Sequence, residues 1–189
     1  QLNINSKDLD GIIYVTQTPD HSQPSNATLL HGRLGCSVDC AALDVGLGCS
    51  GFVYALWLAY SIIANGSSQK VLVLAGDTLS RLVHPQDRAT ASLFGDAGSA
   101  TMVEKQVGSG VSWFRLGSDG RGSDSLIIPA GGARLPFSEE TAAEYTDDDG
   151  NIRTKENLFM DGSEVFNFSI EVVPQEIEAL LDYAGVSKD

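Results

Sequence analysis

The stretch Ala42–Leu56, ALDVGLGCSGFVYAL, decides the local fold because it joins two apolar runs through a segment of small residues. The first run has the length and composition of a short strand, and the second continues into a segment typical of a helix. Between them, Gly46, Gly48 and Gly51 indicate a tight turn. The sequence therefore predicts a strand followed directly by a helix, with Cys49 at the junction.

Apolar runs on both sides of this stretch extend the pattern into a unit of strand, helix and strand. A strand is expected at residues 11–15, the helix at residues 52–65, and further strands at residues 70–76 and 99–104. Such runs without polar alternation are typical of a parallel sheet with both faces covered. The helix is apolar nearly all round, so we expect most of its faces to be buried. The predicted fold class is α/β.

Caps and turns predict the remaining elements. Ser25 is a preferred helix cap and Gly35 a preferred helix end, so a helix is expected between them. The glycine-rich stretch 108–134 predicts short strands separated by turns. Residues 163–184 have an amphipathic helical pattern, and Pro174 inside it is expected to kink or split that helix.

The charge and hydropathy of the chain exclude several classes of function. The chain has 189 residues and a formal net charge of −13, which opposes binding to nucleic acid or to an anionic membrane surface. Its apolar runs all fall short of the roughly 20 residues that a membrane helix needs. We therefore expect no nucleic-acid partner and no membrane partner.

The three cysteines are Cys36, Cys40 and Cys49. An odd number without a signal peptide is typical of a reducing compartment and predicts a cytoplasmic protein. Cys36 and Cys40 could share one helical face, but no second pair of ligands completes a zinc site, so buried or idle thiols are expected. The acidic turn at residues 147–151 resembles a calcium loop, but Tyr145 stands at its first ligand position, and no metal site is predicted.

Cys49 would stand just before the first turn of the helix at residues 52–65. The unpaired N–H groups of a helix N-terminus stabilise a thiolate and lower the pKa of the thiol. Small neighbours leave room for a substrate carbonyl to approach the sulfur, which is the arrangement of an activated nucleophile. The alternative is that Cys49 is a small apolar residue filling a tight corner, and local chemistry leaves both interpretations open.

The segment Asp44–Phe52 resembles the nucleophile segment of the thiolase-like condensing enzymes, in particular ketoacyl-ACP synthase III. Further segments match that family in the same order along nearly the whole chain: residues 10–20, 24–25, 72–81, 87–88, 93–100, 116–120 and 160–166. The resemblance implies a thiolase-like layered fold (α-β-α-β-α), incomplete in this chain. Residues 1–105 would form most of the N-terminal half with the nucleophile, and residues 106–189 the start of the C-terminal half.

The function that this resemblance implies is an acyl-transferring Claisen condensation. Cys49 would accept the acyl group of an acyl-CoA as a thioester. The carbanion of a decarboxylated malonyl-acyl-carrier-protein would then attack it and give 3-oxoacyl-acyl-carrier-protein, which initiates fatty-acid or related polyketide synthesis. The implied partners are acyl-CoA and an acyl carrier protein, with acyl-CoA as a substrate and no cofactor. The implied assembly is a homodimer with residues 18–34 near the partner.

Two further positions match substrate-binding residues of that family. Phe94 matches a phenylalanine beside the active site, and its alternative role is plain core packing. Arg88 matches an arginine near the adenine end of CoA, and its alternative role is a surface ion pair with Asp87 or Asp96.

The catalytic histidine and asparagine of the family have no match in this sequence. The chain is therefore expected to be an internal fragment, inactive by itself, with apolar surface left exposed. His21, His31 and His84 are expected to be surface or structural residues. Two other hypotheses stay open: a truncated or degenerate homologue that acts as a non-catalytic dimerisation module, and an acyltransferase that uses oxygen or nitrogen acceptors. Acyl chain length and the carrier-docking surface are not predicted.

Overall fold

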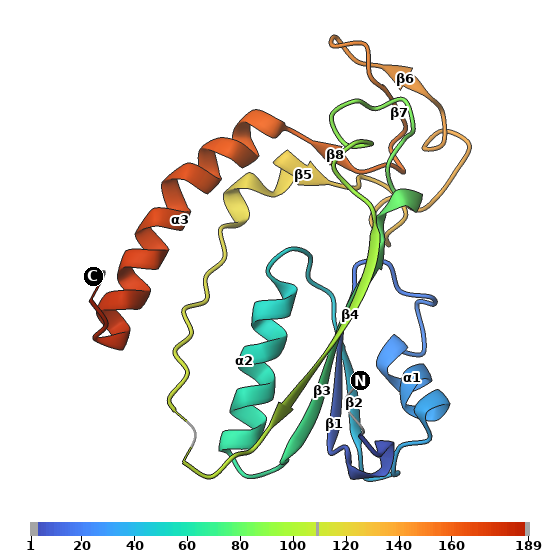
Figure 1. Cartoon of the computed structure of the whole chain (residues 1–189). Helices are drawn as coiled ribbons and strands as arrows, with labels where there is room; N and C mark the ends of the chain where they lie inside the picture. Colours follow the sequence, from blue (N-terminus) through green and yellow to red (C-terminus); the bar gives the residue numbers. More distant parts are fainter. Residues whose placement is uncertain (1–3, 109, 188–189) are drawn as a thin grey trace. The chain divides into compact units, whose positions relative to one another are not determined.

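The computed structural model describes residues 4–108 and 110–187, which form two compact units (Figure 1). The first unit extends to Thr78 and also contains Asp96–Val111. The second unit contains Leu79–Gly95 and the chain from Ser112 onward. The two halves expected for the complete fold, residues 1–105 and 106–189, stay a prediction.

The first unit is built on a four-stranded sheet in the order β2-β1-β3-β4. Its strands are β1 (Gly11–Val15), β2 (Ala41–Val45), β3 (Lys70–Thr78) and β4 (Asp96–Glu104). The first three strands are parallel, as predicted, but β4 is antiparallel to β3. Strand β4 begins beside the end of β3, since Asp96 pairs with Thr78. It therefore runs back along β3 in the opposite direction.

Two helices cover opposite faces of this sheet: α1 (Asn26–Leu34) and α2 (Gly51–Ala64). Neighbouring residues of a strand point to opposite faces, so Ile13 packs in the cluster with α2 while Ile12 packs in the cluster with α1. The predicted caps of α1 are confirmed. Ser25 accepts a hydrogen bond from the Thr28 N–H at 3.3 Å, and Gly35 ends the helix with a φ of 65°.

The prediction that α2 is buried on most of its faces is wrong for the described chain. Its buried residues are Gly51, Ala55 and Ala59, whose spacing of four defines one stripe along the helix. Trp57 and Tyr60, on other faces, are 40% and 42% exposed. A helix packed on one sheet buries only the stripe that contacts it, whereas burial of all its faces needs a second layer.

The second unit contains the longest helix, α3 (Gly162–Ala184), which begins at an Asp161 cap and ends at Gly185. The Asp161 carboxylate accepts hydrogen bonds from the N–H groups of Ser163 and Glu164, each at 3.0 Å. Pro174 does not split the helix, which continues through it as one element of 23 residues. Phe166 and Ile177 on this helix are 63% and 54% exposed.

The remaining elements of the chain are short. They are η1 (Ser6–Asp8), η2 (Leu79–Arg81), η3 (Gly120–Ser125), β5 (Leu126–Ile127), β6 (Tyr145–Thr146), β7 (Ile152–Arg153) and β8 (Phe159–Met160). Strand β5 pairs with β8, and β6 pairs with β7. The glycine-rich stretch is less regular than predicted, because residues 110–119 contain no strand. Within the described residues, none of the helices combines the length and hydropathy that a membrane span requires.

Candidate active site

Cys49 lies on the turn between β2 and α2, as the sequence predicts. The Gly51 N–H donates a 2.8 Å hydrogen bond to the Gly48 carbonyl, and the Tyr54 N–H donates to the Ser50 carbonyl at 3.1 Å as the helix begins. Among the described residues, the Ser50 side chain makes no capping hydrogen bond to this helix. The thiol of Cys49 is exposed. The side chain of Cys49 therefore stands in solvent at the positive end of a 14-residue helix.

Two glycines around Cys49 lie close to the segment that ends β1, and at Gly51 there is no room for a side chain. A β-carbon on Gly51 would collide with Cγ1 of Val15, so α2 can begin this close to β1 only without a side chain. A β-carbon on Gly48 would lie 2.6 Å from Oε1 and 2.9 Å from Cδ of Gln17. The glycines thus hold the turn tightly against the end of β1, and they also leave the sulfur without bulky neighbours along the chain.

The loop that follows β1 is fixed by Asp77, for which the sequence analysis predicts no role. Its Oδ1 accepts hydrogen bonds from Thr16 Oγ1 at 2.9 Å, from the Gln17 N–H at 2.7 Å, and from both the N–H and Oγ1 of Thr18 at 3.1 Å. The Thr78 N–H in turn donates to Thr18 Oγ1 at 2.9 Å. The Asp77 carboxylate therefore connects the loop after β1 to the end of β3, beside the turn that carries Cys49.

Asp44 is a second structural carboxylate that the sequence analysis missed. It lies in β2, and its two oxygens accept 2.7 Å hydrogen bonds from the N–H groups of Asn26 and Ala27. These are the first residues of α1, so a negative charge from the sheet neutralises the positive end of that helix. Asp44 thus connects the strand that precedes Cys49 to the start of α1.

Arg88 and Phe94 lie in the second unit, on the segment Leu79–Gly95, whereas Cys49 belongs to the first. The Arg88 side chain is exposed, and its backbone N–H donates to Oδ1 of Asn151 at 3.1 Å. Phe94 is half-buried, and its N–H donates to the Thr90 carbonyl at 3.3 Å. Arg88 and Phe94 therefore share one segment of the second unit, and Cys49 is part of the first unit.

The alternative that Arg88 pairs with Asp87 is wrong. Asp87 is fully buried and accepts hydrogen bonds from Arg153 Nε at 2.7 Å and from Arg153 Nη2 at 3.2 Å. Burial by itself raises the pKa of the Asp87 carboxyl. The hydrogen bonds from Arg153, Thr90 and the Ala89 N–H outweigh it and hold that pKa below its usual value. Because Asp87 points inward, the neighbouring arginine is left in solvent.

The other cysteines are buried, as predicted. Cys36 and Cys40 pack in the core with Ile12 and Ala27, and burial together with the neighbouring Cys36 raises the pKa of Cys40 to about 11. The two cysteines follow the end of α1 and do not share a helical face. The Cys40 thiol with such a pKa stays protonated at neutral pH. Because Cys36 is buried as well, Cys49 is the exposed candidate among the three cysteines.

The histidines have structural or surface positions, as expected. His31 Nε2 lies 2.8 Å from the Ser37 carbonyl oxygen, His84 Nε2 lies 3.4 Å from Glu144 Oε1, and His21 is exposed. The acidic turn at residues 147–151 joins β6 to β7. There the Asp147 carboxylate accepts from the Asn151 N–H at 2.8 Å and pairs with Arg153 Nη1 at 3.1 Å.

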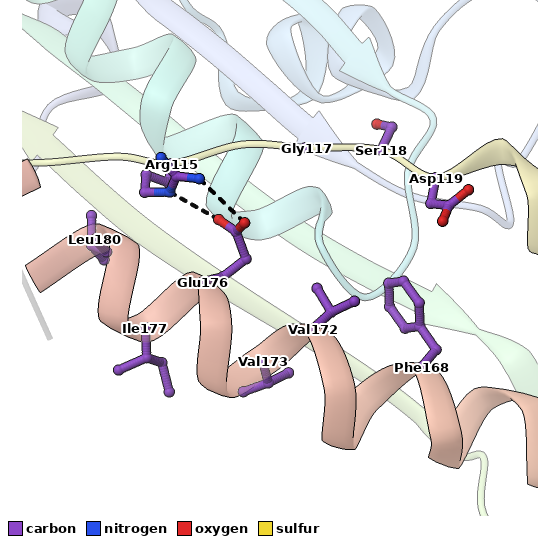
Figure 2. A pocket seen from close by; sticks show the side chains of 10 residues that line it. All are labelled: Arg115, Gly117, Ser118, Asp119, Phe168, Val172, Val173, Glu176, Ile177 and Leu180. Carbon is purple, nitrogen blue, oxygen red and sulfur yellow. Dashed lines mark hydrogen bonds and ion pairs between the residues drawn. The ribbon is translucent and has the colours of Figure 1, made fainter. Parts of the chain in front are cut away.

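A groove of about 500 Å³ lies in the second unit between α3 and the segment 115–119 (Figure 2). Arg115 crosses it with two hydrogen bonds to Glu176, at 2.9 and 3.2 Å. The helix side of the groove is mostly apolar: Phe168, Val172, Val173, Ile177 and Leu180. Such a lining suits packing better than acid–base or nucleophilic chemistry, so the candidate site stays at Cys49.

Comparison with known proteins gives one consistent match. Residues 43–120 match the family model of 3-oxoacyl-[acyl-carrier-protein (ACP)] synthase III. A relative from Campylobacter jejuni is 40% identical over 99% of this chain and 52% of its own length. A beta-ketoacyl-[acyl-carrier-protein] synthase III from Caldanaerobacter subterraneus is 38% identical over 99% of this chain and 54% of its own. The chain therefore spans about half the length of these relatives.

Solved structures agree with the sequence match. A crystal structure of a 3-oxoacyl-(acyl-carrier-protein) synthase III superposes with a TM-score of 0.93 at 41% identity, covering 98% of this chain and 56% of that one. The prediction of an α/β fold of the thiolase-like type is therefore confirmed.

Proposed function

Because the chain is a relative of the 3-oxoacyl-[acyl-carrier-protein] synthase III family over nearly its whole length, we propose that the protein is a condensing enzyme of this type. It transfers an acyl group from acyl-CoA to Cys49 and joins it to the carbanion of a decarboxylated malonyl-acyl-carrier-protein. The product is 3-oxoacyl-acyl-carrier-protein, and the reaction initiates fatty-acid or related polyketide synthesis.

The exposed thiol of Cys49 at the N-terminus of α2 is the observation that carries this proposal. In the first step, the sulfur forms a bond with the thioester carbonyl carbon of acyl-CoA. The bond from that carbon to the CoA sulfur breaks, and CoA leaves with the proton that Cys49 gave up. The positive end of the helix stabilises the attacking thiolate, and the glycines around it admit the carbonyl.

Arg88 and Phe94 are assigned to substrate binding. The guanidinium of Arg88 is proposed to contact the adenine end of CoA. Two observations support this role: the side chain is exposed, and the backbone N–H of Arg88 is held by a hydrogen bond to Asn151. A guanidinium is suited to this role because it stacks on flat rings and binds phosphate groups. Phe94 is proposed to lie beside the acyl site, and its half-buried ring leaves one surface available.

The proposed partners include an acyl carrier protein and a second copy of the chain. Carrier proteins are acidic and this chain carries a net charge of −13, so docking requires a local group of arginines or lysines. The homodimer is proposed to form near residues 18–34. Three free cysteines support the proposal of a reducing, cytoplasmic compartment. Acyl-CoA serves as substrate, and no separate cofactor is proposed.

The condensation assay tests this function. The protein, expressed from its complete gene, is incubated with acetyl-CoA and malonyl-acyl-carrier-protein, and the carrier-bound product is weighed by mass spectrometry. The proposal predicts release of carbon dioxide and a 3-oxoacyl product. Acylation of Cys49 with transfer only to oxygen or nitrogen acceptors contradicts the carbon–carbon step. A folded protein with neither acylation nor product favours the non-catalytic dimerisation module.

A further inference from the structure

The acidic turn between β6 and β7, residues 147–151, holds the side chain of Asn151 in one place. Oδ1 of Asp147 accepts hydrogen bonds from the N–H groups of Asp149 at 3.1 Å and of Asn151 at 2.8 Å. Oδ2 of the same carboxylate accepts from Nδ2 of Asn151 at 3.0 Å. Asn151 is buried, with only 6% of its surface exposed. Both its backbone and its amide nitrogen are therefore bound within the turn, and Oδ1 is left to bind another residue.

That residue is Arg88, whose backbone N–H donates to Oδ1 of Asn151 at 3.1 Å. The residues on either side of Arg88 are held as well. Asp87 accepts a 2.7 Å hydrogen bond from Nε of Arg153, and the Ala89 N–H donates to Oδ1 of Asp87 at 2.9 Å. Three successive residues are thus anchored, while the side chain of Arg88 is exposed.

These contacts close a ring of bonded groups. Asp87 binds Arg153, Nη1 of Arg153 lies 3.1 Å from Oδ2 of Asp147, Asp147 binds Asn151, and Asn151 binds Arg88, which follows Asp87 in the chain. The side chains of Asp87 and Arg153 are 0% and 6% exposed. Displacing any one of the buried members would leave a buried polar group without its partner, which is costly. The backbone of Arg88 is therefore held rigidly.

We propose that Asn151 is a positioning residue for acyl-CoA: its amide holds the backbone of Arg88 so that the guanidinium is presented to the adenine end of CoA. This inference rests on the proposed function and on the role given there to Arg88. Asn151 acts through Arg88 and needs no contact with the substrate. On an anchored segment, CoA has to order only one side chain. On a loosened segment it would have to order the backbone too, and its affinity would fall.

Three variants of the protein expressed from its complete gene test the contact: Asn151→Ala, Arg88→Ala and their combination. The measured quantities are KM and the saturated rate of acetyl transfer to Cys49, with two donors. These are acetyl-CoA and acetyl-pantetheine, which carries the same thioester without the adenine nucleotide. Titration calorimetry of CoA binding gives a dissociation constant that does not depend on the reaction.

Thr141→Ala is the matched control for a loss of buried hydrogen bonds in the same unit. Thr141 is 1% exposed, and its Oγ1 donates to Oε1 of Glu156 at 2.6 Å. Asn151→Ser is a second variant at the tested position, for use where Asn151→Ala does not fold. Its hydroxyl is too short to replace Oδ1, while serine remains a good turn residue.

Asn151→Ala, or Asn151→Ser in its place, should raise both KM for acetyl-CoA and Kd for CoA by about three- to fivefold. The saturated rate and KM for acetyl-pantetheine should keep their natural values, because only binding of the adenine end is affected. In the Arg88→Ala background, Asn151→Ala should change KM by less than about twofold, since the guanidinium that it positions is gone. Thr141→Ala should lower the melting temperature and leave both KM values natural.

An equal rise in KM for the two donors overturns the inference, because it shows a general distortion. A folded Asn151 variant with natural KM for acetyl-CoA also overturns it, as does an undiminished effect of Asn151→Ala in the Arg88→Ala background. Unfolding of both Asn151 variants shows a role in folding and overturns the role in positioning. Arg88→Ala with natural KM and Kd removes the arginine from the CoA site and the inference with it.

Failure of the natural protein to acetylate Cys49 rejects the proposed function instead. In that case the dissociation constants of the same variants for CoA still decide whether Asn151 positions Arg88. A natural protein that neither takes up an acetyl group nor binds CoA overturns both proposals.

Discussion

Arg153 and Asp87 form a buried ion pair in which Nε of Arg153 donates to Oδ2 of Asp87 at 2.7 Å. The two side chains are 6% and 0% exposed. Asp87 directly precedes Arg88, and Arg153 ends β7. The pair therefore ties the segment that carries Arg88 and Phe94 to the β6–β7 hairpin inside the second unit.

Loss of this pair should destabilise the second unit. Asp87→Asn removes the buried negative charge that faces the guanidinium of Arg153, and Asp147, at 3.1 Å, stays as its carboxylate partner. We expect the free energy of unfolding to fall by about 3 kcal/mol. Urea denaturation followed by circular dichroism measures this change. Arg121→Ala is the control, because Arg121 is 91% exposed and its pair with Asp119 should add nothing measurable. Equal stability of the two variants would contradict the role given to Asp87.

The same carboxylate gives a pH dependence of stability. The pKa of Asp87 is lower in the folded chain than its ordinary value of 3.8, so the folded state binds the proton less readily than the unfolded state. Its stabilising contribution is complete above that value and is lost as pH falls through the lower, folded pKa. Acid unfolding of the natural protein should therefore be steeper below pH 3.8 than that of Asp87→Asn. Parallel acid profiles would be inconsistent with this assignment.

Local patterns were sufficient to predict much of the first unit from the sequence. The caps at Ser25 and Gly35, the strand at residues 11–15 and the place of Cys49 follow from signals within a few residues of one another. The buried thiols of Cys36 and Cys40 follow from composition and spacing.

Long-range pairs could not be predicted in the same way. Asp77 and Thr16 are 61 residues apart, and Asp87 and Arg153 are 66 apart, so no local pattern joins them. The sequence analysis overestimates the burial of α2. An apolar composition shows that the side chains favour burial, but only the face that packs on the sheet is covered.

Gly51 should be intolerant of even one added methyl group. Gly51→Ala places a β-carbon against Cγ1 of Val15 in the core, and overpacking of this kind costs about 1–3 kcal/mol of unfolding free energy. Gly32→Ala serves as the comparison. Gly32 lies inside α1 with no described atom within 4 Å of the added carbon, and alanine there should stabilise the helix by about 0.5–1 kcal/mol. Thermal denaturation of both variants tests this prediction: the melting temperature should fall for Gly51→Ala and rise for Gly32→Ala.

Arg88→Ala should weaken acyl-CoA binding without unfolding the protein. The backbone N–H that binds Asn151 is retained, so thermal stability should not change. Loss of one charge-assisted contact should raise KM for acetyl-CoA by about tenfold. Arg134→Ala, at another exposed arginine of the second unit, should leave KM as it is. Identical KM values for both variants would remove Arg88 from the CoA site.

The most direct test of the central claim is the mass of the Cys49 peptide after a single exposure of the intact protein to acetyl-CoA. The account predicts one acetyl group on Cys49, none on Cys36 or Cys40, and none anywhere in a folded Cys49→Ser variant. An unmodified Cys49 in the folded protein, with every acyl-CoA supplied, would contradict the assignment of this thiol as the acyl acceptor.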